Sequence, residues 1–150
     1  MDGSAKSNKQ QKTQDASENP GVEREGAERG RRNKALGKRG EDAAARFLYQ
    51  RGYDIIERNW TCAAGEADII ARDEDCLVFV EVKTRSDCDK GFPAEAVTRD
   101  KRDRYEKIAL SFLKDYEVVD MPVRFDVISI VVIAKNRALI RHHINAFSVA

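Results

Sequence analysis

The chain has 150 residues, 41% of them hydrophobic, which is enough for one compact domain with or without a tail. Its 27 Lys and Arg balance 26 Asp and Glu, so the formal charge of +1 creates no global basic field, and any affinity for nucleic acid must come from a local patch. The longest apolar run, residues 127–134, is interrupted by Ser129, and no apolar stretch typical of a signal peptide opens the chain. We therefore expect a cytoplasmic protein that makes no contact with a membrane.

The three cysteines are isolated from one another along the chain. Cys62, Cys76 and Cys88 are separated by 14 and 12 positions, which fits no Cys-x-x-Cys zinc motif. We expect free thiols in a reducing compartment, and this excludes a disulfide scaffold and a zinc finger.

Residues 1–34 differ in composition from the rest of the chain. They contain no aromatic residue and are rich in Ser, Asn, Gln, Gly and charged side chains, so they cannot bury enough apolar surface to offset the entropy of ordering. We predict a disordered polar tail over 1–34 and one folded domain over 35–150. The basic cluster at Arg29, Arg31, Arg32 and Lys34 could contact phosphate, but a solvated linker is the favoured interpretation.

The folded part begins with an amphipathic pattern. Small and apolar residues recur at helical spacing from Leu36 to Leu48, and Gly52 follows as a stop signal, so we predict a helix over about 35–51. A second helix is predicted from Val97 to near Tyr116. The remaining pattern predicts five strands, Tyr53–Trp60, Glu66–Arg72, Cys76–Lys83, Val123–Ile133 and Ala138–Ile144.

This order of elements indicates the fold class. A helix, a meander of three strands, a crossover helix and two further strands predict an α/β fold with a mixed sheet flanked by helices. The central strands of such a sheet are buried on both faces, so polar side chains within them require an explanation.

The third predicted strand carries the most informative polar residues. Glu81 and Lys83 alternate along the strand, so they share one face, and Glu66 and Asp68 share a face of the preceding strand. If the two strands form a hairpin, Asp68 lies close to Glu81. Two converging carboxylates that are partly buried repel one another and lose hydration, and a divalent cation removes both costs.

This pattern has two interpretations. Two acids and a lysine on adjacent strands are the composition of a phosphodiesterase that uses Mg²⁺ or Mn²⁺, with Lys83 acting on a water molecule or on phosphate charge. The alternative is a structural salt bridge from Lys83 to Asp68 or Glu81 at the rim of the sheet.

Two helical residues are placed to join the same site. Glu41 lies on the apolar face of the first helix, where it could reach the acids or could simply stabilise the helix N-terminus. Lys101 lies in line with Val97, Tyr105 and Ile108, so it either extends its ammonium past the core to solvent or points at substrate phosphate.

These motifs together resemble a known family. Gly40-Glu41-Asp42, the segment Gly65–Arg72, the segment Leu77–Arg85 (LVFVEVKTR), the segment Arg124–Ile128 and Asn145-Ala146-Phe147 are similar to the YraN family of uncharacterised bacterial proteins. The resemblance covers roughly residues 36–148. That family in turn resembles the PD-(D/E)XK nuclease superfamily, most nearly the archaeal-type Holliday-junction resolvases.

The resemblance implies a restriction-endonuclease-like domain that hydrolyses phosphodiester bonds in nucleic acid, and we expect DNA. Asp68, Glu81 and the Val82 carbonyl would hold Mg²⁺ or Mn²⁺, with Glu41 bound directly or through water. Lys83 would position the attacking water, and Arg85 and Lys101 would bind phosphate. Ala67 stands where the superfamily often has proline, which affects the turn and not the ligands.

Two other functions are compatible with the same residues. One is a nuclease fold that binds branched or damaged DNA without cutting it, and the other is a protein–protein adaptor whose polar cluster is an ion-pair rim. Resolvase action would require two active sites, and therefore a symmetric homodimer.

The remaining polar and aromatic residues are assigned structural roles. Arg124 and Asp126 share a face of the fourth predicted strand, and an ion pair is the favoured interpretation. His142 and His143 are adjacent on a strand and point to opposite faces, so they cannot chelate a metal together. Tyr53 and Trp60 are expected to pack in the core.

Overall fold

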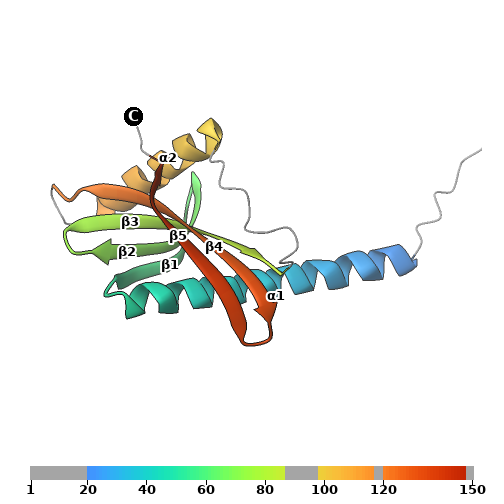
Figure 1. Ribbon diagram of the computed structural model, residues 1–150. Coiled ribbons are helices and arrows are strands. Elements are labelled where there is room, and N and C mark those ends of the chain that lie inside the picture. The colour runs from blue at the N-terminus through green and yellow to red at the C-terminus, as the bar shows by residue number, and fades with distance from the viewer. Residues whose placement is uncertain (1–19, 87–97, 117–119, 148–150) are drawn as a thin grey trace, which may run out of the picture.

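The computed structural model describes residues 20–86, 98–116 and 120–147. Five strands form one sheet in the order β1-β2-β3-β4-β5, and a helix lies against each face (Figure 1). The predicted α/β class with a mixed sheet is confirmed. The elements are α1 (Pro20–Gln50), β1 (Asp54–Cys62), β2 (Gly65–Asp73), β3 (Cys76–Arg85), α2 (Arg99–Asp115), β4 (Val123–Ala134) and β5 (Arg137–Phe147).

The sheet is mixed because one strand pair is parallel. β1, β2 and β3 form the predicted antiparallel meander, and β4 and β5 form a second antiparallel hairpin. β3 and β4 run parallel, with Glu81 opposite Val127 and Lys83 opposite Ser129. A parallel pair needs a crossover connection, and α2 lies in that connection. All five predicted strands are present, with ends that shift by no more than three residues.

Two hydrophobic cores lie on the two faces of the sheet. On the α2 face, rings from three elements pack together, with Phe79 5.8 Å from both Phe112 and Phe125. On the α1 face, Ala44 and Leu48 pack against aliphatic side chains of β3 and β4. Trp60 packs edge-on against Phe112, and Tyr53 is buried, as predicted for both. β3 is therefore covered on both faces.

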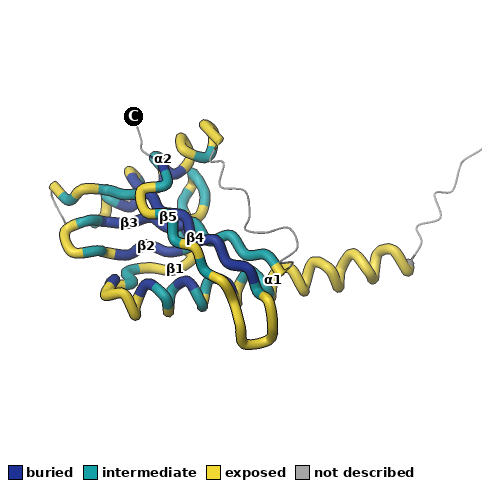
Figure 2. The backbone as a smooth tube through the Cα atoms, in the orientation of Figure 1, coloured by how far each residue is buried: buried dark blue, intermediate teal, exposed yellow. Residues whose placement is uncertain are grey.

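The start of α1 corrects the sequence prediction. α1 begins at Pro20, not near residue 35, so the Pro20–Lys34 part of the predicted disordered tail is helical. Residues 21–35 are exposed throughout, and the helix projects beyond the sheet (Figure 2). This segment is rich in Glu and Arg, which favour helix, but it has no apolar face, so the apolar periodicity used for the prediction could not detect it. Residues 1–19 lie outside the described residues.

The other end of α1 follows the prediction. The helix ends at Gln50, and Gly52 adopts a φ of 88° while its N–H donates to the Tyr49 carbonyl. Near its middle, α1 crosses β3 at Gly40. A Cβ atom at Gly40 would collide with the Thr84 side chain, so only glycine allows this approach. The crossing brings Glu41 to the end of β3.

Helix α2 begins at Arg99, where the Thr98 hydroxyl accepts a hydrogen bond from the Lys101 N–H. Val97, the predicted start, lies outside the described residues. Cys62 and Cys76 are free thiols as predicted, and Cys88 is also outside the described residues. Of the helices in the described part of the chain, none combines the length and the apolar character that spanning a membrane requires.

Candidate active site

The site is built where β2 and β3 separate. The ladder between the two strands extends from Asp73–Cys76 to Ile69–Val80. Beyond this pair a side chain replaces the main chain as the partner of β3: Asp68 Oδ2 accepts a hydrogen bond of 2.8 Å from the Val82 N–H. The hairpin that the sequence predicted therefore places Asp68 against the Glu81–Val82 segment of β3.

Asp68 carries an electrostatic cost in this position. Burial raises its pKa from the ordinary 3.8 to about 6; the hydrogen bond from Val82 opposes that rise, and the charges of Glu41, Glu81 and Glu66 add to it. Four carboxyl groups thus interact at one site, from α1, β2 and β3. We call Glu41, Glu66, Asp68 and Glu81 the acid cluster.

Glu81 is the member of the acid cluster that β3 contributes. Its side chain is 14% exposed, and its Oε1 forms an ion pair with the Lys101 ammonium of α2. The other oxygen, Oε2, is buried and has no hydrogen-bond partner among the described residues. An unpaired buried carboxylate oxygen is costly in a fold with no use for it.

Asn59 of β1 links two members of the acid cluster. With its amide nitrogen turned towards them, it donates to Glu66 Oε1 over 2.9 Å and to Glu41 Oε2 over 3.0 Å. Asn59 has a φ of 50°, a left-handed conformation that Asn tolerates better than most residues. Asn59 was not predicted as a site residue. Glu66 was predicted to share a face with Asp68 but was given no role, although that alternation was the available signal.

Helix α2 contributes two residues that interact with the acid cluster. Lys101 and Tyr105 lie one turn apart, and Lys101 pairs with Glu81. Tyr105 is buried, and burial together with the charges of Glu81 and Asp68 raises the pKa of its hydroxyl. Lys101 was predicted either to extend its ammonium to solvent or to contact substrate phosphate. The ammonium pairs with Glu81 of the acid cluster instead of extending to solvent, and contact with phosphate stays a prediction.

The residues that follow Glu81 line an open hollow. A pocket of about 380 Å³ between α1 and the end of β3 has Glu41, Val82 and Arg85 in its wall. Lys83 is half-buried two residues after Glu81, with Ser129 of β4 beside it in the ladder. The structure therefore brings together Glu41, Asp68, Glu81 and Val82. Arg85 shares the wall of the pocket with Glu41 and Val82.

The donor set of the acid cluster suits a hard divalent cation. Carboxylate oxygens and a main-chain carbonyl are the ligands that Mg²⁺ and Mn²⁺ take. Such an ion would give Glu81 Oε2 a partner, and it would offset the burial and the neighbouring acids that raise the pKa of Asp68. The described residues contain no three Asp, Glu, His or Cys side chains already arranged around a metal position. The residues fit the ion chemically. Lys101 forms an ion pair with Glu81, and Asn59 donates hydrogen bonds to Glu41 and Glu66.

A second polar cluster, formed by Arg124, Asp126, His142, Tyr53 and Asp73, is fully satisfied. The Arg124 guanidinium donates to both Asp126 oxygens at 2.9 and 3.0 Å, and to Asp73 and the Tyr53 hydroxyl. Asp126 also lies 2.8 Å from His142 Nε2 and accepts from the Asn145 N–H. The predicted ion pair of Arg124 and Asp126 is thus confirmed.

Burial alone would raise the pKa of Asp126. The pKa is nevertheless lowered, because Asp126 accepts hydrogen bonds from His142, Arg124 and Asn145 and lies beside the positive charge of Arg124. We call these five residues the arginine cluster.

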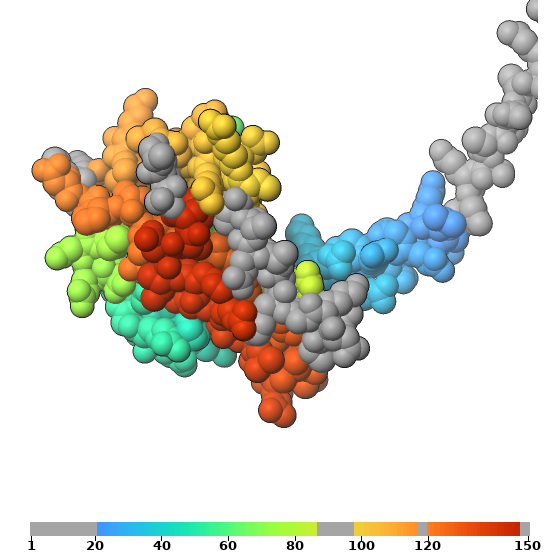
Figure 3. Space-filling view, turned by 45° about the horizontal axis from the view of Figure 1, so that its top comes forward, coloured from blue at the N-terminus to red at the C-terminus, as the bar shows by residue number. Residues whose placement is uncertain are grey.

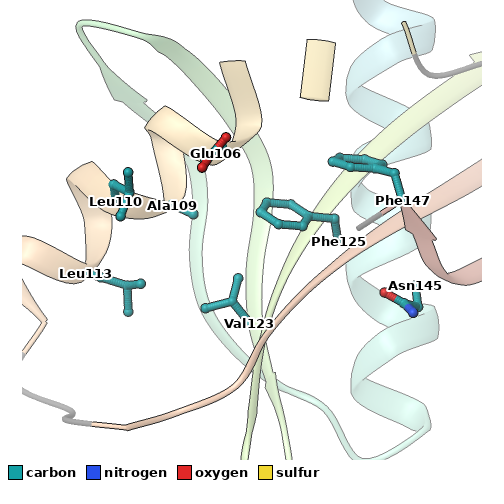
Figure 4. Close-up of a pocket in the computed structure, with 8 residues that line it drawn as sticks. All are labelled: Glu106, Ala109, Leu110, Leu113, Val123, Phe125, Asn145 and Phe147. Atoms are coloured by element: carbon teal, nitrogen blue, oxygen red, sulfur yellow. The ribbon is translucent and has the colours of Figure 1, made fainter. Parts of the chain in front are cut away.

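A separate hollow of about 350 Å³ lies between α2 and strands β4 and β5 (Figure 4). Its wall is apolar apart from Glu106 and Asn145, and the side chains of Leu110, Phe125 and Phe147 border it. It offers a surface for contact and no group of reactive side chains.

Comparison with known proteins gives a consistent result. The model of the uncharacterised protein family UPF0102 matches residues 40–130. A UPF0102 protein of Geobacter sulfurreducens is 48% identical over 118 residues, covering 79% of this chain and 92% of the relative. UPF0102 proteins of Nocardia farcinica and Dictyoglomus turgidum are 47% and 45% identical, covering 72% and 71% of this chain and 85% and 91% of theirs.

Proposed function

The chain belongs to the UPF0102 family, and from this premise we propose that it is a metal-dependent nuclease that hydrolyses phosphodiester bonds in DNA, branched DNA included. The resemblance of its Glu66-Ala67-Asp68 and Glu81-Val82-Lys83 motifs to PD-(D/E)XK nucleases supports the proposal. So does the position of these motifs on two neighbouring strands that separate at the acids.

One observation carries the proposal. Glu81 holds a buried carboxylate oxygen without a hydrogen-bond partner among the described residues, beside an Asp68 carboxyl whose pKa burial and three neighbouring acids raise to about 6. A purely structural site would be expected to balance such charge, because each unpaired buried group costs about 1–3 kcal/mol. Buried acids that lie close to one another are typical of a site that receives a cation.

Each residue then has a distinct role. Asp68, Glu81 and the Val82 carbonyl would hold Mg²⁺ or Mn²⁺, and Glu41 would join them directly or through water. When bound, the ion would act as a Lewis acid on the scissile phosphate. The Lys83 ammonium would orient the attacking water and offset charge that develops on phosphate oxygens. Arg85 in the pocket wall would bind phosphate, and Lys101 would do so after leaving Glu81.

The Lys101–Glu81 ion pair also favours a second candidate. With this pair formed, one metal ligand is occupied by an ammonium, as in a nuclease fold that binds DNA but no longer cuts it. The two candidates both predict DNA binding. They differ because only the nuclease predicts that the acid cluster binds a divalent ion and that cleavage depends on it.

Calorimetry tests the proposal directly. Mg²⁺ and Mn²⁺ are titrated into the wild type and into Asp68→Asn/Glu81→Gln, and the same proteins are assayed for cleavage of four-way-junction and linear duplex DNA. We expect ion binding to disappear in the double variant and cleavage to fall by about 100-fold or more. Lys83→Met should keep ion binding and lose cleavage.

The matched control is Asp75→Asn, which neutralises an exposed acid in the turn between β2 and β3. It should bind the ion and cut as the wild type does. Ion binding that survives in Asp68→Asn/Glu81→Gln would show that the acid cluster is not the metal site. DNA binding without any ion binding or cleavage would establish the second candidate.

A further inference from the structure

The middle of α1 concentrates positive charge next to the acid cluster. From Arg29 to Arg39 the chain has six Lys and Arg and no Asp or Glu, whereas the whole chain has a net charge of +1, so the remainder carries about −5. Glu28 precedes this segment and Glu41 follows it. The weak overall charge therefore conceals a strong separation of charge along one helix.

The basic segment has little role in the fold. Residues 21–35 are exposed, and α1 projects past the body of the sheet in this part (Figure 3). Within the described residues, Arg29, Arg31, Arg32, Lys34 and Lys38 form no ion pair with a carboxylate. Basic residues spaced three or four positions apart on a helix repel one another, so the segment has a cost that an anionic partner would remove.

Two hollows connect this segment to the acid cluster. One, of about 520 Å³, has Arg29, Arg32 and Arg39 of α1 in its wall. The other, of about 380 Å³, has Glu41, Val82 and Arg85 in its wall. They share Asn33, Leu36 and Ser86, so they adjoin, and the path from the basic residues leads to the proposed metal ligands.

The basic surface continues on the other side of Arg39. The Arg39 guanidinium donates to the Lys135 carbonyl over 2.6 Å, which ties α1 to the turn between β4 and β5. A third hollow there is lined by Arg39, Arg46, Lys135 and Arg137 and by no acid. The α1 basic surface, as we use the term, consists of Arg29, Arg32, Arg39, Arg85, Lys135 and Arg137.

We propose that the α1 basic surface is a docking site for the phosphate backbone of double-stranded DNA, which it seats beside the acid cluster. This inference rests on the proposed function and adds how the substrate is held. Arg29 and Arg39 are about 15 Å apart along a helix that rises 1.5 Å per residue. That length matches about four base pairs of a duplex, which presents one negative charge per about 1.7 Å.

The occupant follows from the chemistry of the segment. Charge complementarity requires a polyanion, and the adjoining acid cluster suits one that a divalent ion can bridge. A membrane-binding helix would need an apolar face opposite its basic one, and between residues 21 and 39 the hydrophobic residues are Val22, Ala27, Ala35 and Leu36 alone. Nucleic acid is therefore the partner that this surface fits.

The test measures binding of a fluorescein-labelled 30-base-pair duplex in EDTA, where no cleavage takes place. Arg29→Gln/Arg32→Gln/Arg39→Gln should weaken binding at least about tenfold at low salt and reduce the slope of log K against log salt by about 3. The matched control, Arg99→Gln/Arg102→Gln/Lys107→Gln, removes three exposed charges from α2 and should change neither quantity beyond a small general effect. Arg29→Gln/Arg32→Gln, which leaves the Arg39–Lys135 contact intact, should lower the slope by about 2.

The outcomes separate this inference from the proposed function. Cleavage that keeps its kcat while KM rises in the triple variant supports both. If the triple variant has a smaller salt slope than the wild type but neither protein cleaves DNA, the docking site is supported and the nuclease proposal is wrong. Equal binding and equal slope for wild type and triple variant overturn the docking site, whether or not the acid cluster cleaves DNA. Binding to phosphatidylserine vesicles with no binding to the duplex overturns it as well.

Discussion

The acid cluster and the arginine cluster each contain an aspartate that is largely removed from solvent, Asp68 and Asp126, and the two aspartates have opposite surroundings. Asp126 of the arginine cluster is fully buried, accepts hydrogen bonds from Arg124 and from the Asn145 main chain, and contacts His142. Asp68 of the acid cluster accepts a hydrogen bond from Val82 and faces three other acids. The pKa of Asp126 is lowered, whereas that of Asp68 is raised.

The difference shows why burial of charge alone does not identify a functional site. The arginine cluster satisfies its charges internally, so it needs no ligand. As a structural element it connects β2, β4 and β5 with Tyr53, which precedes β1. The acid cluster leaves the Glu81 Oε2 atom without a partner in the described structure. A cluster whose polar groups are all paired stabilises the fold. A cluster with an unpaired group is expected to lower the stability of the ligand-free protein while it provides a binding site.

The same substitution at the two aspartates should therefore have opposite effects. Asp126→Asn removes the charge that balances Arg124, and breaking such a buried pair costs about 3–5 kcal/mol of unfolding free energy. Because the folded pKa of Asp126 is lowered, its contribution is present above the ordinary carboxyl pKa and is lost as pH falls through the folded value. Urea denaturation at pH 7 and at pH 3 measures both. A variant as stable as the wild type at pH 7 would contradict the structural role.

Asp68→Asn should stabilise the metal-free protein. The folded pKa of about 6 exceeds the ordinary 3.8, so the native state holds this proton more tightly than the unfolded state does, and the wild type loses stability as pH rises from about 4 to about 6. Above that window the variant should gain about 2–3 kcal/mol, and below pH 4 the two proteins should converge. Urea denaturation in EDTA across this range is the measurement. A gain that is the same at pH 4 and pH 8 would show that charge is not its origin.

Part of this contrast could be predicted from the sequence. Alternation placed Glu81 and Lys83 on one face of a strand and Glu66 and Asp68 on one face of the preceding strand. A polar turn between the strands made a hairpin the expected connection. Those local rules were sufficient for the convergence of Asp68 and Glu81. The ion pair between Arg124 and Asp126 followed from the same period of two, whereas the contacts of Arg124 with Asp73 and Tyr53 did not.

The parts that could not be predicted depend on tertiary placement or on signals without periodicity. The helix over Pro20–Lys34 has no buried face, so the pattern of apolar residues carried no trace of it. Asn59 reaches the acid cluster from an irregular β1 in a left-handed conformation, which no composition rule for strands indicates. The pairing of Lys101 with Glu81 depends on where α2 crosses the sheet, and sequence spacing left that open.

Removing the countercharge of Glu81 should have a smaller effect on stability. Lys101→Met keeps the apolar part of the side chain and leaves Glu81 without its ion pair, which should cost the metal-free protein about 1 kcal/mol. In a Glu81→Gln background the same change should cost little, because the pair is already absent. Since Lys101 competes with a cation for Glu81, Lys101→Met should also bind Mg²⁺ about fivefold more tightly by calorimetry. Weaker Mg²⁺ binding by Lys101→Met would contradict competition and would show that Lys101 helps to form the metal site.

The smallest expected effect concerns Asn59. Substitution of this residue tests whether it matters through its hydrogen bonds to two acids of the acid cluster or through its left-handed backbone conformation. Asn59→Gly permits the φ of 50° and removes the amide that donates to Glu41 and Glu66, so the loss of unfolding free energy in EDTA should be at most about 1 kcal/mol. Saturating Mg²⁺ should erase most of that loss, because a cation would then neutralise the acids that the amide serves in its absence. Thermal denaturation of wild type and variant with and without Mg²⁺ measures the difference. A loss of equal size in both conditions would mean that Asn59 shapes β1 and takes no part in balancing the acid cluster.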